Sequence, residues 1–116
     1  MSHRAHFYGI ASRMMRHILI DLARARRAQK RDSAATVYIA ELRELGTDQP
    51  DDMLFALDDA LSRLAREHPR KAQLIEMRYF GGMTAEDSAA VLSVSVHTVR
   101  RELRFAQAWL HRDLAP

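Results

Sequence analysis

The stretch TAEDSAAVLSVSVHTVRRELRF, residues 84–105, decides the fold of this 116-residue chain. Thr84 followed by Asp87 is a capping-box-like start of a helix, in which the threonine hydroxyl accepts a free backbone N–H. Leu92 closes that helix, and Ser95 is a good N-cap for a second helix that follows directly. The stretch therefore predicts two helices joined by a very short turn.

The spacing inside this pair indicates a helix-turn-helix. Ala89 is small where two crossing helices would meet, and Ser93 with Val94 forms the turn. Val99 and Leu103 are four residues apart, so both face the first helix and the core. A small residue, a tight turn and an inward pair are the pattern of a DNA-binding helix-turn-helix. The structural alternative is an ordinary helical hairpin with a basic outer face.

The outer side of the second helix carries hydrogen-bond donors, most of them on its N-terminal half. That half enters the major groove in helix-turn-helix proteins, where Arg can bond two acceptors on guanine. The positive N-terminal dipoles of both helices favour nearby phosphate. The predicted DNA-binding residues are Thr84, Ser95, His97, Thr98, Arg100, Arg101 and Arg104.

Two further helices are predicted before residue 84. The first has an apolar face and takes Asp51 or Asp52 as its N-cap, and the second begins at Pro69 and stops at Gly81 and Gly82. The apolar face of the first consists of Leu54, Leu57, Leu61 and Leu64. The helix capped by Ser95 is expected to run to about Leu114, which makes a four-helix domain over residues 54–116. No alternation of period two is present, so we expect an all-α protein.

Residues 4–31 read as one helix that ends in the basic run ARARRAQKR. Its apolar residues recur every three or four positions and form one stripe. The stripe consists of Phe7, Ile10, Met14, Ile18 and Leu22. Residues 33–53 are rich in turn formers and are interpreted as an acidic, partly flexible linker.

Charge divides the chain in the same way. Residues 1–32 hold eight Arg or Lys against two acids, residues 33–67 three against eight, and residues 68–116 seven against five. A basic first segment is the kind of surface that meets phosphate. No cysteine is present, which excludes disulfides and thiolate metal sites and suits a reducing compartment. Without a signal-peptide or membrane-length apolar run, we expect a cytoplasmic protein with no membrane partner.

Residues 54–114 resemble the C-terminal DNA-binding domain of bacterial sigma-70-type factors, in the extracytoplasmic-function (ECF-like) group. The likeness rests on Met77-Arg78-Tyr79-Phe80-Gly81-Gly82-Met83-Thr84, then Ala89, Leu92, Val94-Ser95, Thr98-Val99, Arg101 and Ala108-Trp109-Leu110. The resemblance implies a sigma domain-four fold of the winged-helix-like DNA-binding superfamily. It implies that this domain reads the promoter −35 element and rests on the polymerase flap through the helices of residues 54–80.

The stretch HFYGIASRMMRHILIDLARARRAQKR, residues 6–31, resembles the last helix of the sigma promoter-melting domain, so residues 1–32 are interpreted as a one-helix remnant of that domain. Members of the group carry further residues before this helix that grip the polymerase clamp, so the chain is expected to be N-terminally short. The resemblance implies −10 element or phosphate contacts on this helix by Arg16, His17, Arg24, Arg26 and Arg27. Promoter DNA, RNA polymerase core and an anti-sigma factor are the implied partners.

We therefore predict a sigma-like transcription initiation factor that is not an enzyme. No nucleophile set, phosphate loop or dinucleotide fingerprint is present, so no cofactor, metal or small-molecule substrate is expected. One alternative is a stand-alone helix-turn-helix regulator that dimerises through its long last helix. Another is a helical adaptor that binds only proteins.

Overall fold

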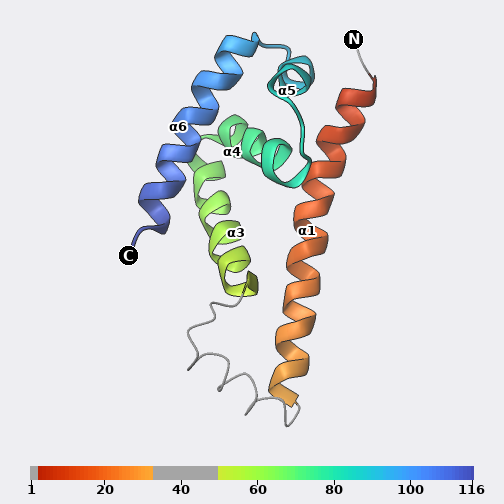
Figure 1. Ribbon diagram of the computed structural model, residues 1–116, viewed down its shortest axis with the longest axis vertical. Coiled ribbons are helices and arrows are strands. Elements are labelled where there is room, and N and C mark those ends of the chain that lie inside the picture. The colour runs from red at the N-terminus through yellow and green to blue at the C-terminus, as the bar shows by residue number, and fades with distance from the viewer. Residues whose placement is uncertain (1–2, 33–49) are drawn as a thin grey trace.

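The computed structural model describes residues 3–32 and 50–116, and every element in these two ranges is helical. In chain order the elements are α1 (His3–Asp32), α3 (Pro50–Glu67), α4 (Pro69–Ile75), the π-helical turn η1 (Glu76–Phe80), α5 (Ala85–Leu92) and α6 (Val96–Leu114). In Figure 1, α3 and α6 cross at one side, α4 lies across the middle, and α1 runs along the other side. The all-α prediction is confirmed for the described residues.

Most helix boundaries agree with those expected from the sequence. Helix α1 is one residue longer at each end than residues 4–31, Pro69 begins α4, and α6 ends at Leu114. The start predicted for α3 was wrong. The helix begins at Pro50, so Asp51 and Asp52 lie in its first turn and neither is its N-cap. The predicted linker 33–53 consequently loses residues 50–53 to α3, and the rest of it, 33–49, lies outside the described residues.

Two apolar clusters form the core, and α6 packs against both. Leu61, Leu64 and Ile75 belong to the first cluster, which joins α3, α4 and α6. Met77 and Val99 belong to the second, which joins α4, η1, α5 and α6. The half-buried side chain of Leu103 on α6 packs against both clusters. Helix α6 is therefore fixed from two sides.

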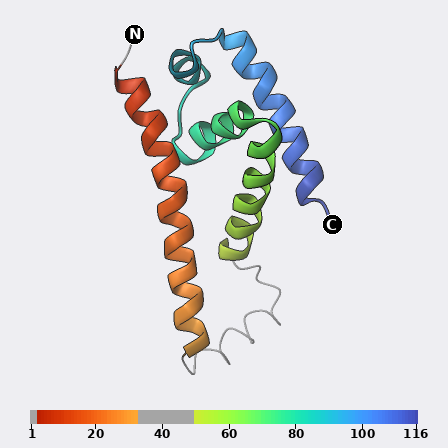
Figure 2. The same cartoon turned by 180° about the vertical axis from the view of Figure 1, so that it is seen from behind.

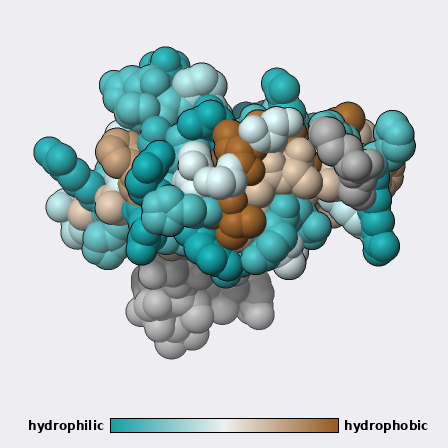
Figure 3. Space-filling view, turned by 90° about the horizontal axis from the view of Figure 1, so that it is seen from above, coloured by the Kyte–Doolittle hydropathy of each residue, from teal (hydrophilic) through white to brown (hydrophobic). Residues whose placement is uncertain are grey.

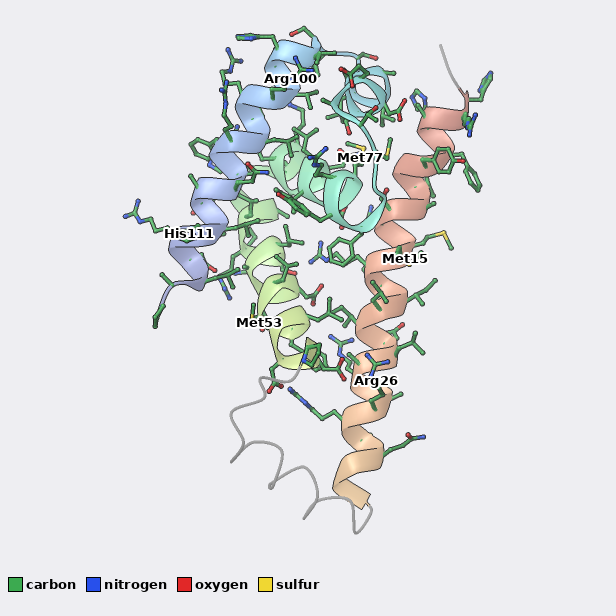
Figure 4. All side chains as sticks on the ribbon, in the orientation of Figure 1. Met15, Arg26, Met53, Met77, Arg100 and His111 are labelled. Atoms are coloured by element: carbon green, nitrogen blue, oxygen red, sulfur yellow. The ribbon has the colours of Figure 1, made fainter. Side chains whose placement is uncertain are left out.

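Helix α1 packs through small and polar side chains, and its apolar stripe faces away from the protein. Ala5, Ser12 and Ala23 are buried, whereas Phe7 is 66% and Ile10 65% exposed. All five residues of the stripe are exposed, and in Figure 4 Met15, on the same outer side, points away from the other helices. The apolar stripe predicted from the sequence therefore lies on the outer side of α1. The inner side of α1 also buries two larger side chains, Ile20 at 3% exposure and Arg16 at 8%.

A buried guanidinium attaches α1 to the helices behind it. The side chain of Arg16 donates from Nε to Asp58 Oδ1 at 2.8 Å and from a terminal nitrogen to Glu76 Oε2 at 2.8 Å. Its other terminal nitrogen reaches the backbone oxygen of Asp58 at 3.0 Å and Ser62 Oγ at 3.1 Å. Arg16 is only 8% exposed, so this network is screened little by water. Figure 2 shows the same neighbourhood of α1 and η1 from behind.

Removing the Arg16 guanidinium is expected to destabilise the fold strongly. Arg16→Met should lower the free energy of unfolding by about 3 kcal/mol, because the buried Glu76 and the half-buried Asp58 would be left as uncompensated charges. Denaturant unfolding followed by circular dichroism measures the loss. Adding Glu76→Gln should recover part of it, and Arg13→Met, on the same helix but exposed, should change stability by less than about 0.5 kcal/mol. Equal stabilities for the wild type and Arg16→Met would contradict the assignment.

Two glycines give a matched pair of substitutions with opposite signs. A Cβ at Gly81 would lie 1.8 Å from Ser12 Oγ and 2.9 Å from the backbone oxygen of Met77, so Gly81→Ala should destabilise the fold by about 1–3 kcal/mol. A Cβ at Gly9, inside α1, would be 3.4 Å from the nearest atom, on Val91. Gly9→Ala should therefore stabilise by up to about 1 kcal/mol through helix propensity. Thermal melts of both variants test the pair, and a destabilised Gly9→Ala would show that α1 packs more tightly than described.

Candidate nucleic-acid interface

Three polar residues set the ends of α5 and the start of α6, each in a defined role. Thr84 caps α5, its hydroxyl accepting the Asp87 N–H at 3.1 Å. Ser93 ends α5 in the left-handed conformation, with φ 56°, and its N–H bonds back to the oxygen of Ala89. Ser95 caps α6, its hydroxyl accepting the Thr98 N–H at 3.0 Å. Both N-caps predicted from the sequence are confirmed.

The inner side of α6 is fixed by apolar and charged contacts. Val99 is fully buried, with 0% exposure, and Val94 from the turn packs into the same cluster. Glu102 is 7% exposed and accepts two bonds from Arg70 of α4, at 2.9 and 2.5 Å. The Arg70 guanidinium lowers the pKa of the Glu102 carboxyl below its ordinary value of 4.5 despite burial. Glu102 is thus ionised at neutral pH and holds α6 against α4.

Because this side of α6 is fixed inward, its arginines and His97 lie outward. His97, Arg100, Arg101 and Arg104 are all exposed, and the first turn of α6 contains no acid. In Figure 4 the labelled Arg100 lies at the end of the molecule where α6 begins. Viewed from that end, hydrophobic surface gathers near the middle and hydrophilic side chains surround it (Figure 3).

The outward residues are not all equally available. Arg100 donates to Glu86 of α5 at 3.2 Å, in a pair whose side chains are both 62% exposed and which therefore exchanges readily with solvent. Thr98 is half-buried and accepts a bond from Ser95 Oγ at 2.9 Å. The first turn of α5 carries Glu86 and Asp87, which oppose a phosphate there. Of the two helix N-termini, that of α6 is the one suited to an anion.

The second predicted set, on α1, is placed differently from the expectation. Arg16 is an internal ion-pair partner in this fold, so the structure does not present its guanidinium at the surface, where a phosphate would meet it. Arg26 makes two bonds to Asp51, at 2.9 and 2.7 Å, and Arg27 pairs with Asp52. These pairs join the basic end of α1 to the acidic first turn of α3.

The remaining two residues of the α1 set are exposed. His17 is exposed beside α3 and α4, and Arg24 is exposed with Asp21 3.6 Å away. Figure 4 places Arg26 and Arg100 toward opposite ends of the molecule, so the structure does not bring the two predicted sets together. Sequence reasoning missed the ion-pair partners of both sets, because pairing between distant helices leaves no local signal.

The described residues hold no group of three or more His, Cys, Asp or Glu side chains that could bind a metal ion. None of the helices in the described ranges is both long and apolar enough to cross a membrane.

Comparison with known proteins supplies the family. No curated protein and no solved structure matches the chain. The family model described as "ECF sigma factor" matches residues 1–116. The match therefore includes α1 and α6, the helices that carry most of the predicted DNA-contact residues. The chain therefore belongs to the ECF sigma factor family, a family of non-enzymatic transcription initiation factors that bind DNA and RNA polymerase.

Proposed function

We propose that this protein recruits RNA polymerase core to promoters and reads promoter DNA with the N-terminal half of α6. The observation that carries the proposal is the division of α6 into two sides. Val99 and Glu102 are held inward, and Arg100, Arg101 and Arg104 are exposed on the other side. A helix with a fixed back and a cationic front suits a major groove, which it can enter without rearranging the fold.

In this proposal α5, the turn and α6 act as a helix-turn-helix. Arg100 and Arg101 are the candidates for bidentate bonds to guanine or for phosphate contacts, and Arg104 extends the row by one turn. Ser95 and His97 lie at the start of α6, near its positive dipole end, where they suit a backbone phosphate. Thr84 caps α5 and Thr98 bonds the α6 cap residue Ser95, so both contribute by keeping the two helix starts in place. When DNA binds, the Arg100 guanidinium breaks its bond to Glu86 and forms one to the DNA.

The proposal assigns α1 a second DNA contact at the −10 element. His17 and Arg24 are exposed, and they are the α1 residues most ready to meet a phosphate. Arg26 and Arg27 join them when Asp51 and Asp52 release their guanidinium groups. Arg16 is left out because its bonds are internal.

The remaining assignments follow from the family. The helices within residues 54–80 dock on the polymerase flap, an anti-sigma factor is a further partner, and the protein acts in the cytoplasm, where polymerase works. The chain itself catalyses no reaction, because its part is to position polymerase on DNA. In this scheme residues 1–32 serve the −10 element and the helices from residue 50 onward form the −35 domain.

Replacing the outward arginines tests the reading of DNA by α6. The double variant Arg100→Ala, Arg101→Ala should bind promoter DNA at least about 30-fold more weakly, because each good Arg–base pair is worth roughly 1–3 kcal/mol and the variant removes two. The binding constant of the double variant should also depend less on salt. The slope of log K against log salt should become about 2 less negative if both arginines contact phosphates. The probes are duplexes obtained by in vitro selection with the wild-type protein and core polymerase, and binding is measured by fluorescence anisotropy.

Arg112→Ala is the matched control, since this arginine is also exposed on α6 but lies in its last turn. It should bind DNA like the wild type. Unchanged affinity in the double variant would favour a protein-binding adaptor. A stable homodimer that binds DNA but does not co-purify with core polymerase would instead favour a stand-alone regulator.

A further inference from the structure

The outer side of α1 carries a row of large apolar side chains that the proposed function does not use. This row is the α1 stripe of Phe7, Ile10, Met14, Ile18 and Leu22, and its side chains are 49–66% exposed. In Figures 1 and 2, α1 forms one edge of the molecule, and the other helices all lie to one side of it. Within residues 3–32 and 50–116, the α1 stripe therefore faces solvent along about four turns of helix.

The exposed area of the α1 stripe is large for a monomer. A side chain of this size has about 200 Å² of accessible surface, so five that are half to two-thirds exposed leave roughly 600 Å² in water. The largest apolar patch on a typical monomer is about 300–600 Å². Two copies that covered the stripe against each other would bury about 1,200 Å² together, which reaches the lower bound of a stable, specific interface.

The order of side chains along α1 is self-complementary when two copies run antiparallel. With the twofold axis between Met14 and Met15, Phe7 lies opposite Leu22 of the second copy, and Ala11 lies opposite its Ile18. Each large side chain at one end thus meets a large one, and the small Ala11 leaves room for the branched Ile18. A surface that matches itself across a twofold axis is the requirement for an isologous dimer.

Charge favours the antiparallel over the parallel arrangement. The second half of α1 ends in the basic run ARARRAQKR, and a parallel pair would place the two basic runs side by side, where like charges repel. An antiparallel pair separates them to opposite ends of the dimer. Asp21, the one acid among residues 3–29, then lies opposite the first turns of the second copy, which contain Arg4 and no acid.

We propose that this chain forms an antiparallel homodimer through the outer side of α1. The Arg16 network fixes α1 from behind, so the stripe is preformed and dimerisation costs little ordering entropy. Helix α6 lies on the other side of the molecule, and its arginines stay free in the dimer (Figure 1). The proposal therefore does not depend on how α6 reads DNA.

Two other occupants fit the α1 stripe less well. A membrane surface would cover the apolar side chains, but it would also press the Asp21 carboxylate, which is 75% exposed beside them, toward the lipid. A nucleic acid would meet the cations at the flanks of α1 and leave the apolar side chains without a partner.

Sedimentation equilibrium of the full chain should show a monomer–dimer equilibrium. Met14→Glu should raise the dissociation constant at least about 100-fold, because it removes two apolar contacts and places two carboxylates at the twofold axis. Met53→Glu is the matched control, since this methionine of α3 is 64% exposed and lies away from the stripe. It should dimerise like the wild type, and circular dichroism should show that both variants are folded.

Disulfide cross-linking tests the antiparallel register, because the chain has no cysteine of its own. A mixture of Phe7→Cys and Leu22→Cys should form a cross-linked dimer under mild oxidation. Neither variant alone should do so, since equal positions in the two copies would lie about 22 Å apart, far beyond the Cβ separation of about 4 Å that a disulfide requires.

Several outcomes would overturn the dimer. They are a monomer at every concentration, equal dissociation constants for Met14→Glu and the wild type, and an equal loss in Met53→Glu. Cross-linking of Leu22→Cys by itself would overturn the antiparallel arrangement. A monomeric wild type that co-sediments with vesicles of anionic phospholipid, and whose binding Met14→Glu abolishes, would identify a membrane surface as the occupant instead.

Discussion

The orientation of α6 depends on its inner side, which is held by two different interactions at once. Val99 and Ala106 are fully buried in separate clusters, and Leu103 between them touches both. Glu102 adds a charged attachment to Arg70 on α4. A helix fixed at several successive inward positions cannot rotate about its axis, so the direction of its arginines is a consequence of core packing.

Helix α1 is attached by a different kind of chemistry. On its inner side Ile20 is the one large apolar residue that is buried within residues 3–32, Ala5, Ser12 and Ala23 are small, and the guanidinium of Arg16 adds bonds to Asp58 and Glu76. Arginine suits this position because its planar group can bond Asp58, Ser62 and Glu76 together. The geometry is specific, since a carboxylate shifted by one helical turn would not reach it. The same arrangement leaves the large apolar side chains of α1 in solvent.

These two attachments give the molecule two distinct outer surfaces. The outer side of α6 is cationic, whereas α1 exposes a stripe of large apolar side chains. Members of the family bind both promoter DNA and RNA polymerase, so more than one binding surface is expected on a chain of this size. Acidic side chains at the start of α3 meanwhile neutralise part of the basic end of α1.

The sequence by itself determined the helices, because caps, turns and apolar spacing act within a few residues of one another. Thr84, Ser95 and the inward Val99 were all assigned from local pattern, as was the outward row of arginines. Tertiary structure alone decided the direction of α1, since its apolar periodicity was equally compatible with either side facing inward. It also decided that Arg16 is internal, because the acids that neutralise it lie 42 and 60 residues away. Pairing over such distances is set by helix packing, and no local spacing records it.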